Sequence, residues 1–206
     1  MAKVTNVGVH IVEGSAAAAD TGGEGQIWVK SDTPCSLYYT GDTGIDNRIS
    51  GITLNAEIDS SSGAQSYDVT GIPTGVKKIK VLFAGVSTSG TEKPMVQLGT
   101  GGSPTTSGYL GGADYDNGGG AINLGAGFQF NSWSASYTGQ GALEFWLEDA
   151  TNNVWVSRGQ VFDSASASNN RKYAGSVPLS GTLDMLRIKN TGTDTFDAGG
   201  IGVQFE

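Results

Sequence analysis

The stretch Leu143-Glu144-Phe145-Trp146-Leu147-Glu148 alternates apolar and polar side chains, and Asp149-Ala150-Thr151-Asn152 and Val154-Trp155-Val156 follow it. Alternation with a period of two is typical of a β-strand that buries one face, here the face with the two leucines and the phenylalanine. A four-residue hairpin loop over Asp149–Asn152 would bring Trp146 opposite Trp155 on the second strand. The alternative is that one tryptophan fills the core while the other is partly exposed. In both cases the stretch predicts a β-hairpin.

Similar short apolar runs continue along the chain, and glycine or Asx turns separate most of them. The further predicted strands are Ile49–Ile58, Tyr67–Val69, Ile79–Phe83, Met95–Leu98, Ile122–Leu124, Phe128–Phe130, Val161–Phe162, Leu183–Ile188 and Ile201–Phe205. Glycine supplies 33 of the 206 residues without a three-residue period, which excludes collagen and agrees with many turns that need positive φ. Many short strands without a long helical pattern predict an all-β fold, with a β-sandwich or jelly roll over residues 51–206.

Residues 1–50 are predicted to form a small β region of their own. Alternating apolar residues begin it, and Gln26–Lys30 and Leu37–Thr40 are two short apolar strands joined by a turn. Ser15 is placed to cap one or two helical turns over Ala16–Asp20, the one short helix that we predict.

This N-terminal region has too little apolar material to form a stable core alone. We therefore expect it to pack on partner chains or on a larger particle. The residues expected at this attachment or subunit interface are Val7, Val9, Ile11, Ile27, Trp28, Leu37 and Tyr39.

The charge balance argues against a nucleic-acid partner. The net charge is −8, and the 12 basic residues are scattered along the chain, so the basic footprint of a nucleic-acid-binding protein is missing. The densest basic cluster is Lys77, Lys78 and Lys80 beside an apolar run. We expect a solvated strand edge there, which discourages edge-to-edge pairing.

Cys35 and His10 are the only cysteine and the only histidine. One cysteine forms no intramolecular disulfide, and this pair alone cannot make the usual four-ligand zinc site. Neither a metal nor a cofactor is expected. Met1-Ala2-Lys3 leads into alternating residues rather than an apolar h-region, and no apolar run is long enough to span a bilayer. We therefore expect synthesis in a cytoplasm and no membrane insertion.

Two parts of the chain resemble structural proteins of tailed bacteriophages. The first resemblance, to a module near the N-termini of fibre, spike and other virion proteins, is carried by Gln26-Ile27-Trp28-Val29-Lys30, Thr33-Pro34, Leu37-Tyr38-Tyr39-Thr40 and Gly41-Asp42-Thr43-Gly44-Ile45-Asp46. The second, to the C-terminal domain of phage tail-fibre and related fibre proteins, is carried by Ile79–Gly90, Val96–Gly99, Gly108–Leu110, Ser180–Asp184 and Asp194–Gly199.

The resemblance implies a virion protein, and because related fibres are trimers it implies a three-fold interface. Many such fibres have a long shaft between the two parts, and this chain lacks one. Attachment as a tail fibre, as a capsid-surface fibre or as a capsid decoration therefore stays open.

A fibre of this kind is expected to recognise a glycan on the host surface. Sugar rings stack on exposed aromatic side chains, while Asp, Asn and Gln satisfy their hydroxyl groups. Four aromatic residues stand in Gly/Ser/Asn-rich surroundings typical of recognition loops. These candidate glycan-binding residues are Tyr109, Tyr115, Trp133 and Tyr137, and the alternative is that their rings cover the ends of the sandwich.

Catalysis is not expected. The candidate carboxylate pairs are Glu144 with Glu148, Glu148 with Asp149, and Asp114 with Asp116. The first pair shares a strand face about 13 Å apart at the Cα atoms, which exceeds the usual carboxylate separation in glycosidases. The loop Asp114-Tyr115-Asp116-Asn117 offers oxygen ligands for calcium, but a turn held by Asx hydrogen bonds explains it more simply.

We therefore expect a non-enzymatic bacteriophage virion structural protein located on the particle surface. In this interpretation it is a short homotrimeric fibre or spike, attached to other capsid or tail proteins through residues 1–50. The β-sandwich over residues 51–206 would be exposed for recognition of a host-surface glycan. One alternative is a capsid decoration or cement protein that stabilises the virion without binding a receptor. A second is a polysaccharide depolymerase.

Overall fold

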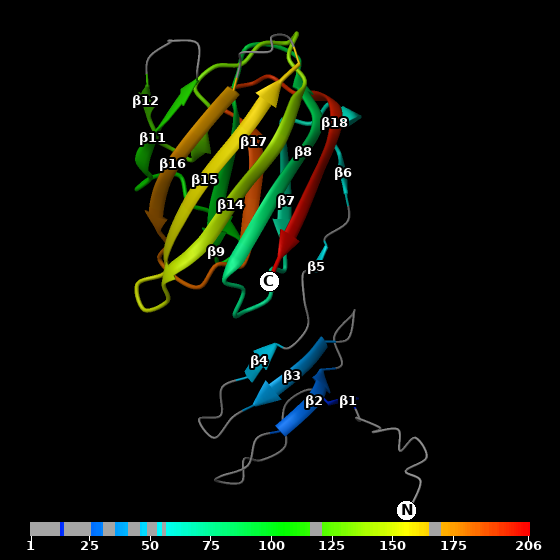
Figure 1. Cartoon of the computed structure of the whole chain (residues 1–206), viewed down its shortest axis with the longest axis vertical. Helices are drawn as coiled ribbons and strands as arrows, with labels where there is room; N and C mark the ends of the chain where they lie inside the picture. Colours follow the sequence, from blue (N-terminus) through cyan, green and yellow to red (C-terminus); the bar gives the residue numbers. More distant parts are fainter. Residues whose placement is uncertain are drawn as a thin grey trace, which may run out of the picture. The chain divides into compact units, whose positions relative to one another are not determined.

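The fold is all-β, and the chain divides into two compact units, Met1–Gly51 and Ile52–Glu206, next to the predicted boundary at residue 50 (Figure 1). The computed structural model describes residues 13–14, 26–30, 36–40, 46–48, 53–54, 57–115, 121–164 and 170–206. Within these ranges there is no α-helix, and the one helical element is the 3₁₀ turn η1 (Ser60–Ser62). The helix predicted at Ala16–Asp20 lies outside the described residues.

The N-terminal unit contains one small sheet. Its strands, in spatial order, are β1 (Glu13–Gly14), β2 (Gln26–Lys30), β3 (Ser36–Thr40) and β4 (Asp46–Arg48). Strands β2 and β3 are antiparallel, and Trp28 lies directly opposite Tyr38 with the ring centroids 5.0 Å apart. The indole N–H of Trp28 donates a hydrogen bond of 2.9 Å to the Thr40 hydroxyl. The two predicted apolar strands are therefore present and pair as a hairpin.

The larger unit is a β-sandwich of two antiparallel sheets. The larger sheet has, in spatial order, β12 (Ile122–Asn123), β11 (Leu110–Tyr115), β16 (Asn170–Pro178), β15 (Val154–Asp163), β14 (Gly139–Asp149), β8 (Lys78–Thr88), β18 (Phe196–Phe205) and β5 (Thr53–Leu54), with β6 (Ile58–Asp59) also paired to β18. The smaller sheet has β10 (Ser103–Pro104), β9 (Pro94–Thr100), β17 (Met185–Asn190) and β7 (Ser66–Thr70), with β13 (Phe128–Gln129) paired to β9. This confirms the predicted β-sandwich.

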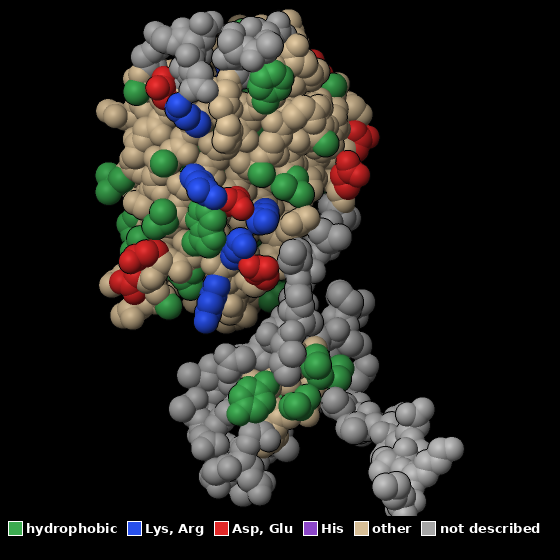
Figure 2. Space-filling model, viewed as in Figure 1, with side chains coloured by type: hydrophobic (Ala, Val, Ile, Leu, Met, Phe, Trp, Pro, Cys, Tyr) green, Lys and Arg blue, Asp and Glu red, His purple; other side chains and the backbone are tan. Residues whose placement is uncertain are grey.

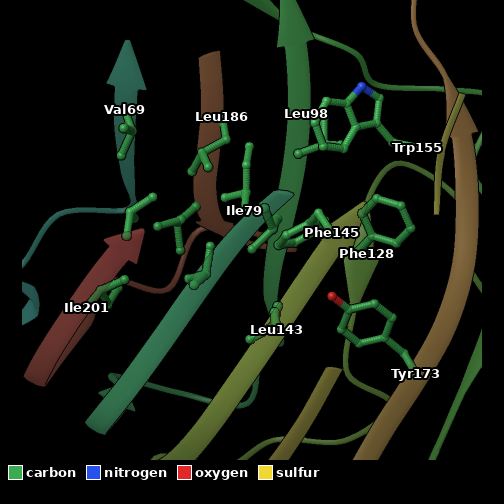
Figure 3. Packing of buried hydrophobic residues seen from close by; sticks show 14 of the residues in the cluster. Val69, Ile79, Leu98, Phe128, Leu143, Phe145, Trp155, Tyr173, Leu186 and Ile201 are labelled. Atoms are coloured by element: carbon green, nitrogen blue, oxygen red, sulfur yellow. The ribbon is translucent and has the colours of Figure 1, made fainter. Parts of the chain in front are cut away.

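The core lies between the two sheets (Figure 3). Ile79, Phe145 and other inward residues of the larger sheet face Leu98 and Leu186 of the smaller sheet, all of them buried. The Phe128 ring, on β13, contacts three other aromatic rings at centroid distances of 4.9 to 5.6 Å. Apolar burial on this scale is the main stabilising contribution to such a fold.

The β14–β15 hairpin differs in register from the prediction. A bulge between Leu147 and Asp149 shifts the pairing, so that Trp146 lies opposite Val156 and Leu147 lies opposite Trp155. The predicted Trp146–Trp155 pair is therefore wrong, because the extra residue in the bulge rotates the two tryptophans onto opposite faces. The alternative is confirmed: Trp155 is 2% exposed in the core, and Trp146 is partly exposed on the outer face.

The basic cluster at the start of β8 does not lie at a sheet edge, contrary to the prediction. Strand β8 is central, with β14 on one side and β18 on the other. Lys78 lies 3.2 Å from Glu206 and Lys80 lies 3.7 Å from Glu144. Lys78 and Lys80 therefore pair with acids of the neighbouring chain segments, Glu206 just after β18 and Glu144 on β14.

Candidate functional site

The outer face of the larger sheet carries a grid of polar side chains over β14, β15 and β16. Side chains alternate across a strand, so the residues between the buried core positions face outward. The register places Glu144 opposite Arg158, Ala142 opposite Gln160, and Gln140 opposite Phe162. On the next strand, Lys172 lies opposite Gln160 and Asn170 lies opposite Phe162.

These side chains surround an open groove of about 650 Å³. The groove is lined by Gln140, Gly141, Ala142, Glu144, Arg158, Gly159, Gln160, Phe162, Asn170, Lys172 and Tyr173. Its middle is low because the side chain of Ala142, on the outer face, is small. On the core side of the sheet, the Tyr173 ring occupies the space that a Cβ atom of Gly159 would need.

A charged cluster lies at one end of the groove. Glu144 accepts hydrogen bonds from Nε and Nη2 of Arg158 at 3.3 and 3.1 Å, and its other carboxylate oxygen is 3.7 Å from Nζ of Lys80. The Arg158 guanidinium also lies 5.4 Å from the centroid of the Trp146 ring. Figure 2 shows this face, with basic side chains and the acids between them gathered over β8, β14 and β15. The cluster fixes the direction of Arg158.

The other end of the groove has an exposed aromatic ring. The Phe162 side chain is 42% exposed. Phe162 lies opposite Gln140, six residues along β14 from Trp146. At about 3.3 Å per residue, the two aromatic side chains lie roughly 20 Å apart along the strands. The groove is therefore a strip of amides and charges between two aromatic residues.

The buried pair Asp163–Arg171 supports the Phe162 end from the core side. The two charged groups are 2.9 Å apart, and both side chains are almost completely buried. The Arg171 guanidinium lies 4.7 Å from the Tyr137 ring centroid and 5.8 Å from that of Trp133. Asp163 follows Phe162 on β15, and Arg171 lies between two groove residues on β16. The pair therefore fixes the strands that present Phe162 and its neighbours.

Three of the four aromatic residues predicted to bind a glycan do not line the groove: Tyr109, Trp133 and Tyr137. Tyr109 and Trp133 are each 4% exposed and belong to the core. The Tyr109 hydroxyl accepts a hydrogen bond from the Leu98 N–H and donates one to the Thr105 carbonyl, and burial raises its pKa. Tyr137 is partly buried against Trp133, and the side chain of Tyr115 lies outside the described structure. The two core rings have no free face for a sugar, because their loops fold inward over Arg171 and Phe128.

The sequence reasoning missed the groove residues. Gln140, Gln160 and Arg158 are ordinary polar residues on the solvent face of a strand, and Phe162 was assigned only to a short strand. The available signal was an aromatic residue in register with amide residues on the polar face. Recognising that signal requires the register between neighbouring strands, and the sequence alone did not give this register.

The predicted interface of the N-terminal unit is described in part. Ile27 and Tyr39 lie opposite each other in the hairpin and are 58% and 44% exposed. Trp28 is buried at 7% exposure, and Leu37 is partly buried. Val7, Val9 and Ile11 lie outside the described residues, as do Cys35 and His10. The described part of this unit therefore presents one exposed apolar pair.

The acidic candidates lie at different places in the described structure. Glu144 is the one carboxylate in the groove lining, and Glu148 is exposed at the bulge. Asp149 caps the hairpin turn: its pKa is lowered because its carboxylate accepts hydrogen bonds from the Asn152 side chain and from the Asn152 and Thr151 N–H groups. Asp114 lies on β11, whereas Asp116 and Asn117 are outside the described residues.

The described residues contain no group of three or more His, Cys, Asp or Glu side chains that could hold a metal ion. No helix in this part of the chain is long and apolar enough to cross a membrane. Comparisons of the chain with protein-family models, curated proteins and solved structures find no match. The groove over β14, β15 and β16 is therefore the strongest candidate site.

Proposed function

We propose that this chain is a bacteriophage virion structural protein, a short trimeric fibre or spike whose β-sandwich binds a glycan on the host surface. The virion context follows from the sequence resemblance described above. The observation that carries the binding function is the open groove between Trp146 and Phe162, with its amide and charged lining.

The chemistry of the lining suits a sugar. The carboxamides of Gln140 and Gln160 each carry both donors and acceptors, as sugar hydroxyl groups require. The exposed face of Phe162 offers an apolar surface for the C–H face of a sugar ring. Because the groove is open along its length, the ligand is an extended chain of sugars rather than a small enclosed molecule.

The exposed apolar pair in the N-terminal unit supports the attachment role. Ile27 and Tyr39 offer apolar surface on a small sheet that has little core of its own. Packing of this surface against copies of the same unit, or against other virion proteins, would bury it. A trimer would also present three grooves together, and multivalent binding strengthens weak single-site contacts.

Binding without cleavage is the better account of the groove. Glycosidases use two carboxyl groups that flank the scissile bond. The described lining offers one, Glu144, and that group is paired with Arg158 and Lys80.

Competition with phage adsorption tests this proposal. The purified protein is added to host cells before the phage, and the fraction of adsorbed phage is measured. We expect saturable inhibition by the wild-type protein, and at least tenfold weaker inhibition by Phe162→Ala. The matched control is Leu110→Ala, which removes another exposed apolar side chain, 67% exposed and outside the groove.

Two results would contradict the proposal. If the protein binds only to virions stripped of this protein and not to cells, it acts as a decoration or cement protein. If Phe162→Ala and Leu110→Ala inhibit as well as the wild type, cell binding does not use the groove.

A further inference from the structure

The charged groups around the groove are compensated by opposite charges. Glu144 accepts hydrogen bonds from Nε and Nη2 of Arg158, and its other carboxylate oxygen lies 3.7 Å from Nζ of Lys80. On the other side of the groove, Lys172 lies directly opposite Asp114 on β11, and both residues have partners. Figure 2 shows acidic side chains among the basic ones on this face. Within the part of the chain that the structure describes, each cation that lines the groove therefore has a carboxylate beside it.

An acidic ligand gains little from such a surface. A carboxylate placed near Arg158 or Lys172 also comes close to Glu144 or Asp114, and like charges repel each other. The ligand would also lose part of its hydration without gaining a free counter-charge, which is costly. The chain as a whole carries a net charge of −8, so its long-range field repels anions as well. The charges around the groove therefore act against acidic sugars.

Four uncharged residues of the groove lining form a patch on β14 and β15. This neutral patch consists of Gln140, Ala142, Gln160 and Phe162. Gln140 lies opposite Phe162, and Ala142 lies opposite Gln160. Residues directly opposite each other in a sheet have Cβ atoms about 4.5–5.5 Å apart. The two carboxamides are therefore diagonal neighbours, and each has an apolar group beside it.

The neutral patch matches the chemistry of an uncharged sugar ring. The exposed Phe162 side chain offers a flat apolar surface to the C–H face of the ring. Gln140 lies next to Phe162 across the strand pair, Gln160 lies next to it along β15, and both glutamines are exposed. Their carboxamides donate and accept hydrogen bonds, as the hydroxyl groups at the edge of the ring do. The patch therefore offers one stacking surface and two sets of hydrogen-bonding groups around it.

We infer that the groove selects a neutral oligosaccharide, with one hexose ring packed on Phe162 and its hydroxyl groups bound by Gln140 and Gln160. Acidic sugars are excluded by the carboxylates of Glu144 and Asp114, which lie beside the cations of the groove. This inference rests on the proposed glycan-binding function and names the class of its ligand.

A glycan array tests the inference with chemically matched ligands. It carries linear oligosaccharides of neutral hexoses in several linkages and lengths, and the same oligosaccharides after oxidation of each primary alcohol to a carboxylate. We expect the wild-type protein to bind the neutral form about tenfold or more tightly than the oxidised form, because like charges at a binding surface suppress the wrong ligand. This preference should shrink as salt is raised, because exposed charges are screened.

Two variants test the neutral patch. Gln140→Ala and Gln160→Ala should each weaken binding of the neutral form by about fivefold or more, because each removes hydrogen bonds to the sugar. Gln204→Ala, on β18 and outside the groove lining, is the matched control and should bind like the wild type.

A third variant tests the exclusion of acidic sugars. Glu144→Gln removes the carboxylate that Arg158 and Lys80 share, so both cations become available to an anion. It should bind the oxidised form several-fold more tightly than the wild type does, with little change for the neutral form. Glu148→Gln removes the same charge from an exposed position of β14 outside the groove lining and should leave the preference unchanged. Thermal unfolding of all variants verifies that the fold is retained.

The outcomes separate this inference from the function on which it rests. Equal or tighter binding of the oxidised form by the wild type would overturn the neutral selection and leave glycan binding intact. Wild-type affinity in both Gln140→Ala and Gln160→Ala would overturn the assignment to the neutral patch, and an unchanged preference in Glu144→Gln would overturn the role of that carboxylate. Binding to no saccharide, together with no competition against phage adsorption, would overturn the proposed function as well.

Discussion

Arg171 and Asp163 form an ion pair inside the β-sandwich, with Nη2 of Arg171 2.9 Å from Oδ2 of Asp163 and both side chains almost completely buried. The rings of Tyr137 and Trp133 flank the guanidinium. Two charged residues at the end of the groove are thus flanked by aromatic residues that the sequence offered either as glycan-binding rings or as a cover for the ends of the sandwich.

Removing one member of this pair should destabilise the protein strongly. In Asp163→Ala the Arg171 guanidinium stays buried without its counter-charge, and such changes cost about 3–5 kcal/mol. Urea unfolding followed by tryptophan fluorescence measures the loss. The double variant Asp163→Leu, Arg171→Met removes both charges and should be more stable than the single variant. A single variant as stable as the wild type would contradict the structural role of the pair.

Gly159→Ala should destabilise the sheet beneath the groove. The new Cβ atom would meet the Tyr173 ring and the Leu143 side chain, and overpacking of a core typically costs about 1–3 kcal/mol. Thermal unfolding provides the comparison. Gly202→Ala, on β18 of the same sheet, is the control, because its nearest neighbour would be Leu82 at an ordinary 3.7 Å. Equal unfolding temperatures for the two variants would show that the Tyr173 ring can move aside without a loss of stability.

The Asp68–Arg187 pair should make stability depend on acidity. Nε and Nη2 of Arg187 lie 2.6 and 2.7 Å from the two Asp68 carboxylate oxygens, and these hydrogen bonds lower the pKa of Asp68. Because the pKa is lower in the folded state than in the unfolded state, the pair stabilises the fold above the unfolded-state pKa. That contribution is lost as the pH falls through the folded-state pKa.

Asp68→Asn should therefore be less stable than the wild type at pH 7, by up to about 1 kcal/mol for a pair this exposed. In strong acid the two proteins should have equal stability. Denaturant titrations across this pH range measure the difference. A difference that does not change with pH would assign the effect to packing rather than to charge.

Replacement of the exposed apolar pair should impair assembly. We expect Ile27→Lys with Tyr39→Asp to reduce self-association, because these exposed apolar groups no longer pack against a neighbouring copy. Sedimentation velocity reports the oligomeric state, and the unfolding temperature of the β-sandwich should not change. If the sedimentation coefficient does not change, Ile27 and Tyr39 do not belong to the subunit interface.

The all-β fold and most strands could be predicted because alternation and glycine-rich turns are local signals. Strand β16 was missed because an arginine occupies one of its buried positions, where the pattern requires an apolar residue. Strand β11 was missed because Gly111, Gly112 and Ala113 give little apolar signal. The register of β14 with β15 depends on a bulge at Glu148, which the turn sequence does not specify.

The groove was missed for a reason that differs from the one for the missed strands. The sequence left open whether the aromatic residues in polar loops bind a glycan or cover the ends of the sandwich, and the Trp133 ring lies beside a buried guanidinium. The groove combines residues from the consecutive strands β14, β15 and β16, which become neighbours through the register of sheet pairing. Phe162 and Gln140 show this, because each is unremarkable alone and they become neighbours only in the antiparallel register.

Binding of the labelled protein to host cells before and after periodate oxidation tests the central claim most directly. Periodate cleaves vicinal diols of surface glycans and leaves most protein receptors in place. The account predicts saturable binding of the wild-type protein that is lost after oxidation, and weak binding of Phe162→Ala to either kind of cell. Binding that survives both oxidation and the Phe162→Ala change would contradict glycan recognition by the groove.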